Sequence, residues 1–225
     1  REGNFLKELR FGATLKHLRK LDSDADTIVA ELRKQKFAVP VGYDDNIVIR
    51  NKQKEYVYKP SLETIFILLT DACNLRCDYC FIKGNMPKQH QGAKIMILDT
   101  AKETIDMYFN NLRPTKFHKT IVFYGGEPLL MFPLFKQIIS YIYASHGKAL
   151  KKFKIGLLLI TNGTKINDEI AEYLAKHREI TICISLDGCK ETNNQKRFYT
   201  DGKGTFQDII TGIDHLRLAG RNDIN

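Results

Sequence analysis

The feature that most constrains the fold is a pattern that begins near residue 64 and occurs four times. Each unit is a short apolar run, then a turn, and then a stretch with helical apolar spacing. The expected strands are residues 65–69, 120–124, 155–160 and 180–185, and the expected helices are residues 97–110, 133–145, 168–177 and 205–218. Such alternation predicts an α/β fold with a parallel sheet, and the continuous apolar runs predict strands buried on both faces.

The first 60 residues differ from the rest and predict a small, mainly helical preface. Helical apolar spacing covers residues 5–21 and 24–35, and a polar stretch without clear periodicity follows Pro40. We therefore expect two domains, a helical preface over residues 1–60 and an α/β core over residues 61–225. Because the sequence stops where a fifth strand would begin, the core is expected to be truncated after about four βα units.

Composition favours an ordinary globular protein, since 43% of the 225 residues are hydrophobic. No apolar run approaches the length of a membrane span and no signal sequence is evident, so a cytoplasmic protein without membrane contact is expected. The net charge is +9 and is densest around Lys148, Lys151, Lys152 and Lys154, which we interpret as a solvated helix end. Nucleic-acid binding is not expected, because no zinc-finger or RNP-type signature accompanies the charge.

Three of the five cysteines, Cys73, Cys77 and Cys80, lie close together directly after the first expected strand. This spacing is a poor layout for disulfides and fits metal or cluster ligation in a reducing compartment. Three thiolates on a four-iron cluster leave one iron open to a substrate or cofactor. The alternative is a tetrahedral zinc site that takes a fourth ligand from elsewhere, for instance His90.

Polar motifs follow the later expected strands. They are Gly125-Gly126-Glu127-Pro128, Thr161-Asn162-Gly163-Thr164, Ser185-Leu186-Asp187-Gly188 and a segment from Asn194 to Arg197 that precedes a glycine-rich turn. Each motif alone is an ordinary turn. Because the chemistry of parallel α/β sheets lies at the carboxyl ends of strands, we expect these motifs to meet the cysteines at one edge of the sheet.

The cysteine spacing, with the aromatic Tyr79 before the third cysteine, resembles the radical S-adenosylmethionine (SAM) superfamily. The resemblance implies a partial (βα) barrel, a [4Fe–4S] cluster held by Cys73, Cys77 and Cys80, and SAM as the second cofactor. In that family the open iron binds the amino and carboxylate groups of SAM. Electron transfer then splits a C–S bond and gives a 5′-deoxyadenosyl radical.

The resemblance also implies a set of residues around SAM. They are Tyr79, Gly125, Gly126, Glu127, Asn162, Ser185 and Arg197. The Gly125–Glu127 turn resembles the motif that supports the methionine ammonium, while Ser185 and Arg197 resemble residues that hold its carboxylate. Asn194 stands where the family usually has aspartate, so an ion pair that would orient Arg197 is missing or replaced.

The order of these motifs over residues 64–206 resembles anaerobic sulfatase-maturating enzymes and SPASM-type peptide maturases. This implies modification of a precursor peptide or protein, a flavodoxin-type or other reductase as electron donor, and a peptide-recognition role for the preface. Two other functions stay open at this point. One is a radical SAM enzyme that acts on a small molecule in cofactor biosynthesis, and the other is a structural zinc-binding interaction protein.

Overall fold

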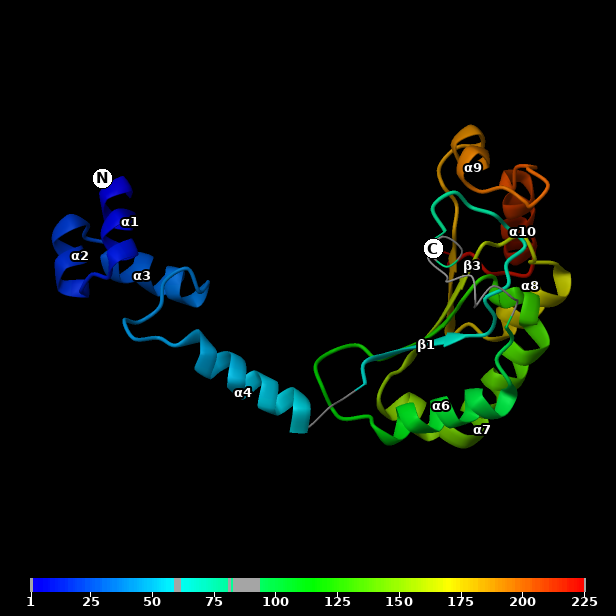
Figure 1. The fold of residues 1–225 in the computed structure, drawn as a ribbon, viewed down its shortest axis with the longest axis horizontal. Coiled ribbons are helices and arrows are strands. Elements are labelled where there is room, and N and C mark those ends of the chain that lie inside the picture. Colours follow the sequence, from blue (N-terminus) through cyan, green and yellow to red (C-terminus); the bar gives the residue numbers. More distant parts are fainter. Residues whose placement is uncertain (1, 59–61, 81, 83–93, 225) are drawn as a thin grey trace. The chain divides into compact units, whose positions relative to one another are not determined.

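The computed structural model describes residues 2–58, 62–80, 82 and 94–224 (Figure 1). The chain divides into two compact units, Arg1–Lys59 and Pro60–Asn225. The first unit contains the helices α1 (Glu2–Phe11), α2 (Leu15–Leu21), α3 (Ala25–Lys34) and α4 (Asp45–Tyr58). The second unit contains the four strands and the remaining helices, and it carries the motifs described above.

The helical unit has a small apolar core of Phe5, Leu18, Ala25 and Val29, which joins α1, α2 and α3. The continuous helix expected over residues 5–21 is wrong. The chain turns at Gly12, whose φ of +85° lies in the left-handed region that glycine adopts without strain. A separate helix, α2, then begins after Thr14, which caps it by accepting a hydrogen bond from the backbone N–H of His17 at 3.2 Å.

The polar stretch after Pro40 contains a helix, α4, that the sequence pattern did not indicate. In the part of α4 whose side chains the structure describes, two of the apolar residues, Ile47 and Ile49, are 55% and 50% exposed. A helix without an apolar stripe leaves no periodic signal in the sequence.

The core unit is built on a parallel sheet in the order β1-β2-β3-β4. The strands are β1 (Thr64–Leu68), β2 (Thr120–Tyr124), β3 (Gly156–Thr161) and β4 (Ile180–Ile184), and the connecting elements are α6 (Leu98–Asn110), η2 (Pro128–Met131), α7 (Phe132–Lys152), α8 (Asp168–Lys176), α9 (Lys190–Lys196) and α10 (Phe206–Leu218). The strands lie within one residue of their predicted ends. The expected alternation of strands and helices in an α/β fold is confirmed.

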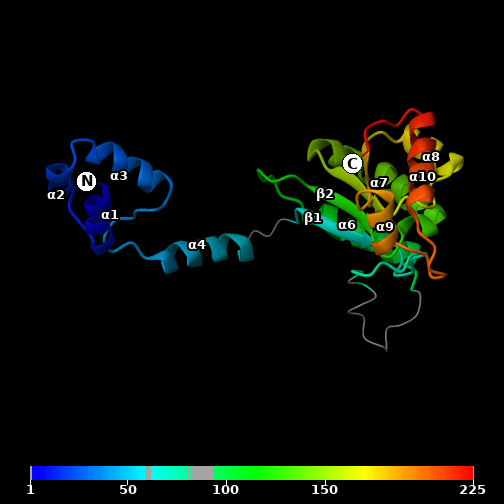
Figure 2. The same ribbon diagram turned by 90° about the horizontal axis from the view of Figure 1, so that it is seen from above.

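Apolar side chains of α6, α7, α8 and α10 pack against one face of the sheet in a single core cluster; Figures 1 and 2 show these helices grouped beside the strands. Ile67, Phe123, Leu159 and Ile182 stand side by side in register on this face and are fully buried. The other face is not covered to the same degree by the described residues, since Phe66 is 54% exposed. The expectation of strands buried on both faces is therefore wrong for β1, whereas it is confirmed for β2, in which Val122 lies on the same face as Phe66 and is 3% exposed.

In the core unit, α7 is longer than the sequence predicted, and α9 was not predicted. Helix α7 has 21 residues and continues to Lys152, past the predicted end, and Lys148, Lys151 and Lys152 are exposed at its last turns as expected. The seven-residue helix α9 was not predicted, because it is short and entirely polar. Among the described residues, no helix combines the length and apolar character needed to cross a membrane.

An ion pair between a buried lysine and a partly exposed glutamate joins the amino ends of the first two strands, at the opposite end of the sheet from the motifs. Lys119, whose side chain is 3% exposed, donates to Glu63 Oε2 at 2.7 Å and to the hydroxyl of Thr115 at 2.8 Å. The backbone carbonyl of Glu63 also accepts a hydrogen bond from the amide of Thr120 at 2.9 Å. These contacts hold β1 and β2 together where the chain enters the sheet.

We expect Glu63→Ala to destabilise the protein more than Lys119→Met. The first change leaves a buried ammonium without its carboxylate, which costs about 3 kcal/mol, whereas the second replaces that ammonium by an apolar side chain of similar volume. The free energy of unfolding of the metal-free protein, measured with urea, compares the two variants. A larger loss of unfolding free energy in Lys119→Met than in Glu63→Ala would contradict the cost assigned to the unpaired ammonium.

Candidate functional site

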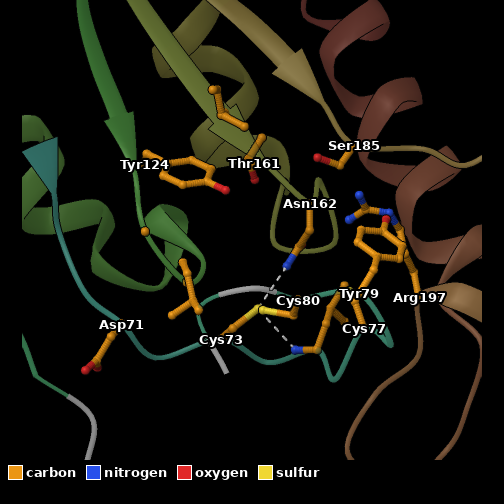
Figure 3. Close-up of a pocket in the computed structure, with 15 residues that line it drawn as sticks. Asp71, Cys73, Cys77, Tyr79, Cys80, Tyr124, Thr161, Asn162, Ser185 and Arg197 are labelled. Carbon is orange, nitrogen blue, oxygen red and sulfur yellow. Dashed lines mark hydrogen bonds between the residues drawn. The ribbon is translucent and has the colours of Figure 1, made fainter. Parts of the chain in front are cut away.

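The carboxyl ends of the strands open into one pocket (Figure 3). Its lining residues are Asp71, Cys73, Leu75, Cys77, Tyr79, Cys80, Ile82, Tyr124, Gly125, Gly126, Ile160, Thr161, Asn162, Ser185 and Arg197. This set contains every site residue predicted from the sequence except Glu127. Motifs that are more than a hundred residues apart in the sequence therefore meet at one edge of the sheet, as parallel topology predicts.

Residues 70–80, which we call the cysteine loop, are held on one side by the turn after β2. The amide of Gly126 donates to the carbonyl of Thr70 at 2.8 Å, and the amide of Glu127 donates to the carbonyl of Ala72 at 2.8 Å. A Cβ atom on Gly125 would lie 2.3 Å from the Thr70 oxygen, and one on Gly126 would lie 2.1 Å from the Ala72 oxygen. The two glycines therefore permit close approach to the backbone of the cysteine loop.

A second segment, residues 196–199, holds the other side of the cysteine loop. The amide of Arg76 donates to the carbonyl of Phe198 at 2.8 Å, and the amide of Asp78 donates to the carbonyl of Lys196 at 3.1 Å. An antiparallel bridge joins Leu75 to Tyr199. An irregular loop that carries three thiols is thus paired through its backbone on both sides, and Arg197 is part of one of the pairing segments.

Glu127 is fully buried and lies behind the pocket wall. Its carboxylate accepts hydrogen bonds from the amide of Leu129 at 2.9 Å, the hydroxyl of Thr161 at 2.7 Å and the amide of Asn162 at 2.7 Å. Burial raises the pKa of this carboxyl, and the three hydrogen bonds act in the opposite direction. The side chain of Glu127 therefore braces the end of β2 against the end of β3.

Asn162 reaches from the end of β3 to the first cysteine. Its Nδ2 lies 3.8 Å from Cys73 Sγ and 3.0 Å from Asn74 Oδ1, while its Oδ1 accepts a hydrogen bond from the amide of Thr164 at 3.0 Å. The amide of Leu75 lies 3.4 Å from the same sulfur. Both contacts to the sulfur are drawn as dashed lines in Figure 3. The Cys73 sulfur thus accepts from a side-chain amide and a backbone amide.

Arg197 is oriented by a carboxylate that sequence reasoning did not single out. Its Nε donates to Asp187 Oδ2 at 3.1 Å, and the hydroxyl of Tyr79 donates to the same oxygen. The guanidinium also lies over the Tyr79 ring, 5.4 Å from its centroid. Burial and the hydrogen bond to Asp187 raise the pKa of the Tyr79 hydroxyl.

The ion pair expected to be missing or replaced at position 194 is therefore replaced by one with Asp187, three residues after the end of β4. Asn194 itself accepts a hydrogen bond from the amide of Phe206 at 2.9 Å and packs against Gly204. It shapes the turn before α10. The available sequence signal for Asp187 was its place in a motif at a strand end.

The remaining cysteines and Ser185 occupy the places that their sequence context indicates. Ser185 lines the pocket on the side of Arg197. Cys183 lies partly buried in β4, and Cys189 is exposed at the start of α9; neither of these cysteines lines the pocket.

Burial raises the pKa of the Cys77 thiol, and the charge of Arg197 opposes that shift. His90, the suggested zinc ligand, lies outside the described residues.

The donor set fits a cluster that is held by three cysteines. Across the described ranges, no three His, Cys, Asp or Glu side chains gather closely enough to hold one metal ion. Cysteines of a four-iron cluster bind different irons, so their sulfurs stand farther apart than sulfurs that share one ion. Cys73, Cys77 and Cys80 line one pocket, together with the backbone of Gly125 and Gly126.

Comparison with known proteins gives one family. The Radical SAM superfamily matches residues 67–224. The cysteine-type anaerobic sulfatase-maturating enzyme of Clostridium novyi is 31% identical over 160 residues, which cover 69% of this chain and 40% of that enzyme. The radical SAM cyclopropyl synthase TigE of Paramaledivibacter caminithermalis is 23% identical over 208 residues, which cover 87% of this chain and 42% of the synthase.

A solved structure with the same core is native anSMEcpe with bound AdoMet and Cp18Cys peptide. It is 26% identical, has a TM-score of 0.57, and is matched over 72% of this chain and 41% of its own length. The chain thus spans less than half the length of these relatives. The parallel sheet is therefore a partial radical SAM barrel, as expected, and the cofactors that this family requires are a [4Fe–4S] cluster and SAM.

We expect Gly126→Ala to destabilise the core and to lower iron incorporation. The added Cβ would meet a backbone oxygen, which has little freedom to move, at a cost of about 1–3 kcal/mol. Gly147→Ala is the matched control, because a Cβ at this position of α7 has no neighbour within 4 Å and alanine favours helix. Urea unfolding and the iron content after reconstitution measure both effects. Equal stability of the two variants would contradict the close approach described above.

Proposed function

We propose a function for this chain from one established fact: it belongs to the radical SAM superfamily. The proposed function is reductive cleavage of SAM to a 5′-deoxyadenosyl radical, which then serves to modify a peptide or protein. The cluster supplies the electron for this cleavage when it is bound. The observation that carries the proposal is the meeting of three thiols, the Gly125–Gly126 turn and Arg197 at the carboxyl ends of adjacent strands.

In this proposal Cys73, Cys77 and Cys80 each bind one iron, and the fourth iron stays open for SAM. Arg197 and Ser185 then hold the SAM carboxylate. The geometry supports this assignment for Arg197, because Asp187 engages its Nε, and no hydrogen bond within the described residues uses its Nη atoms. A guanidinium whose Nε is held by a carboxylate and whose Nη atoms remain available suits a planar carboxylate ligand.

The other predicted site residues support SAM in different ways. Gly125 and Gly126 offer their backbone to the methionine ammonium from the turn that also holds the cysteine loop. Glu127 acts from behind this turn as a brace, since its carboxylate bonds to protein groups. Tyr79 bounds the pocket beside Arg197, and Asn162 faces Cys73.

We propose a peptide or protein substrate because proteins with a similar core act on, or are seen with, such substrates. The Clostridium novyi relative is a sulfatase-maturating enzyme, and anSMEcpe is seen with a bound peptide. The partly exposed face of the sheet, on which Phe66 and Tyr124 are neighbours, offers an apolar surface beside the cysteine pocket. Such a surface suits the side chain of a peptide residue that is brought to the radical.

The helical unit provides a second reason to propose a peptide substrate. It contains an apolar groove of about 750 Å³ that is lined by α1, α2, α3 and residues 37–43. Phe37 and Val41 line this groove although they are 79% and 90% exposed. Arg10 and Arg33 lie among the lining residues, and neither has an ion-pair partner within the described residues. We propose that this unit recognises an apolar, acidic segment of the substrate peptide.

The match to the cyclopropyl synthase supports a shared role for the helical unit. It covers 87% of this chain, which is more than the core unit contains, so it extends into the helical unit.

We further propose a flavodoxin-type reductase as electron donor and a cytoplasmic location. All five cysteines are free, and thiolate ligands of this kind require a reducing compartment.

The first test is anaerobic reconstitution with iron and sulfide, in which iron and zinc are counted per chain. We expect about four irons per chain, loss of most of this iron in Cys73→Ala, Cys77→Ala and Cys80→Ala, and native iron content in the control variants Cys183→Ala and Cys189→Ala. SAM should shift the EPR signal of the reduced protein. Zinc in place of iron, or equal loss in all five variants, would refute the assignment.

The groove is tested with two synthetic peptides that share the same leucine positions and differ in having glutamate or lysine between them. The full chain should bind the glutamate peptide about tenfold more tightly in fluorescence anisotropy. The double change Arg10→Glu and Arg33→Glu should reverse this preference, while Arg50→Glu, at an exposed site outside the groove, should preserve it. Equal affinity for both peptides would show that the groove does not select acidic segments.

A further inference from the structure

The three thiols differ in their hydrogen bonding. Cys73 Sγ accepts from the backbone amide of Leu75 at 3.4 Å and from Asn162 Nδ2 at 3.8 Å. Among the residues that the structure describes, neither Cys77 nor Cys80 has a comparable donor to its sulfur. One of the three candidate cluster ligands is thus distinguished from the other two by the protein around it.

Asn162 is not free to turn away from this sulfur. Its backbone amide donates to the buried carboxylate of Glu127 at 2.7 Å, and its side-chain Oδ1 accepts from the amide of Thr164 at 3.0 Å and from the Thr164 hydroxyl at 2.8 Å. Its Nδ2 is shared between Cys73 and Asn74 Oδ1, and the Nδ2 of Asn74 donates in turn to the Thr164 hydroxyl at 2.8 Å. Because the oxygen of the Asn162 amide is already engaged, its nitrogen must face the sulfur.

The surroundings make this contact electrostatically effective. Asn162 is 7% exposed, and it approaches Cys73 from β3, a strand that is distant in sequence from the cysteine loop. Water screens a dipole poorly at such a site, so an N–H aimed at a thiolate has a larger effect than at the surface. Hydrogen bonds to cysteine sulfurs are one of the means by which a protein sets the reduction potential of an iron–sulfur cluster.

We propose that Asn162 acts through Cys73 to raise the reduction potential of the cluster. The positive end of its N–H dipole stabilises the more negative, reduced cluster, so it eases electron uptake from the donor. The backbone amide of Thr164 and the Oδ1 of Asn74 hold the side-chain amide of Asn162 in the required orientation. This inference rests on the proposed function, because it takes Cys73 to be a cluster ligand.

The test is a redox titration of the reconstituted, SAM-free protein followed by EPR. In Asn162→Ala the donor is lost, and the ratio of reduced to oxidised cluster at the native midpoint should fall about tenfold, which is ~59 mV for a one-electron couple. Thr164→Val is the matched control. It removes a hydroxyl from the same network but keeps the Thr164 amide that holds Asn162, so its potential should stay native.

A second pair of variants covers the case in which Asn162→Ala does not assemble a cluster. Asn162→Asp keeps an oxygen for the Thr164 amide and removes the donor, whereas Asn74→Asp adds the same charge beside Cys73 and keeps an oxygen for Asn162 Nδ2. The potential should fall further in Asn162→Asp than in Asn74→Asp.

The outcomes separate this inference from the proposed function. Native potentials in both Asn162 variants, or equal shifts in each variant and its control, would overturn the role of Asn162 and leave the cluster assignment intact. A native chain that binds no iron would instead overturn the proposed function, and the inference with it.

Discussion

The site depends on the backbone pairing of the cysteine loop with two other segments of the core. An irregular loop pays a large entropic cost to hold three thiols in one orientation. Here its carbonyls accept from Gly126 and Glu127 on one side, and its amides donate to residues 196 and 198 on the other. The loop is therefore fixed by main-chain hydrogen bonds, which tolerate side-chain change but do not tolerate a Cβ at the two glycines.

The same pairing links the proposed SAM-binding groups to the proposed cluster ligands. The turn that contacts the loop also carries Glu127, which ties β2 to β3 and fixes the amide of Asn162. The segment on the other side carries Arg197, and Asp187 joins its guanidinium to the hydroxyl of Tyr79 within the loop. Displacement of any one of these segments therefore moves both the thiols and the groups that would hold SAM.

Much of this arrangement could be predicted from the sequence, because strong local patterns determine it. Apolar runs located the four strands, and parallel topology implied that the motifs after Leu68, Tyr124, Thr161 and Ile184 would meet. Contacts between side chains from different motifs could not be predicted, because no local pattern encodes them. The pairing of Arg197 with Asp187 and the inward direction of the Glu127 carboxylate belong to this class, as does helix α4, which lacks an apolar face.

Because main-chain hydrogen bonds of the protein form the pairing of the cysteine loop, we expect them to order this loop in the metal-free protein as well. Amide hydrogen exchange of the metal-free protein tests it most directly at Arg76, Asp78, Gly126 and Glu127, whose N–H groups form the pairing. We expect these four amides to exchange much more slowly than in an unstructured peptide, and cluster reconstitution to change their rates little. Exchange at the unstructured rate in the metal-free protein, with protection only after reconstitution, would contradict it.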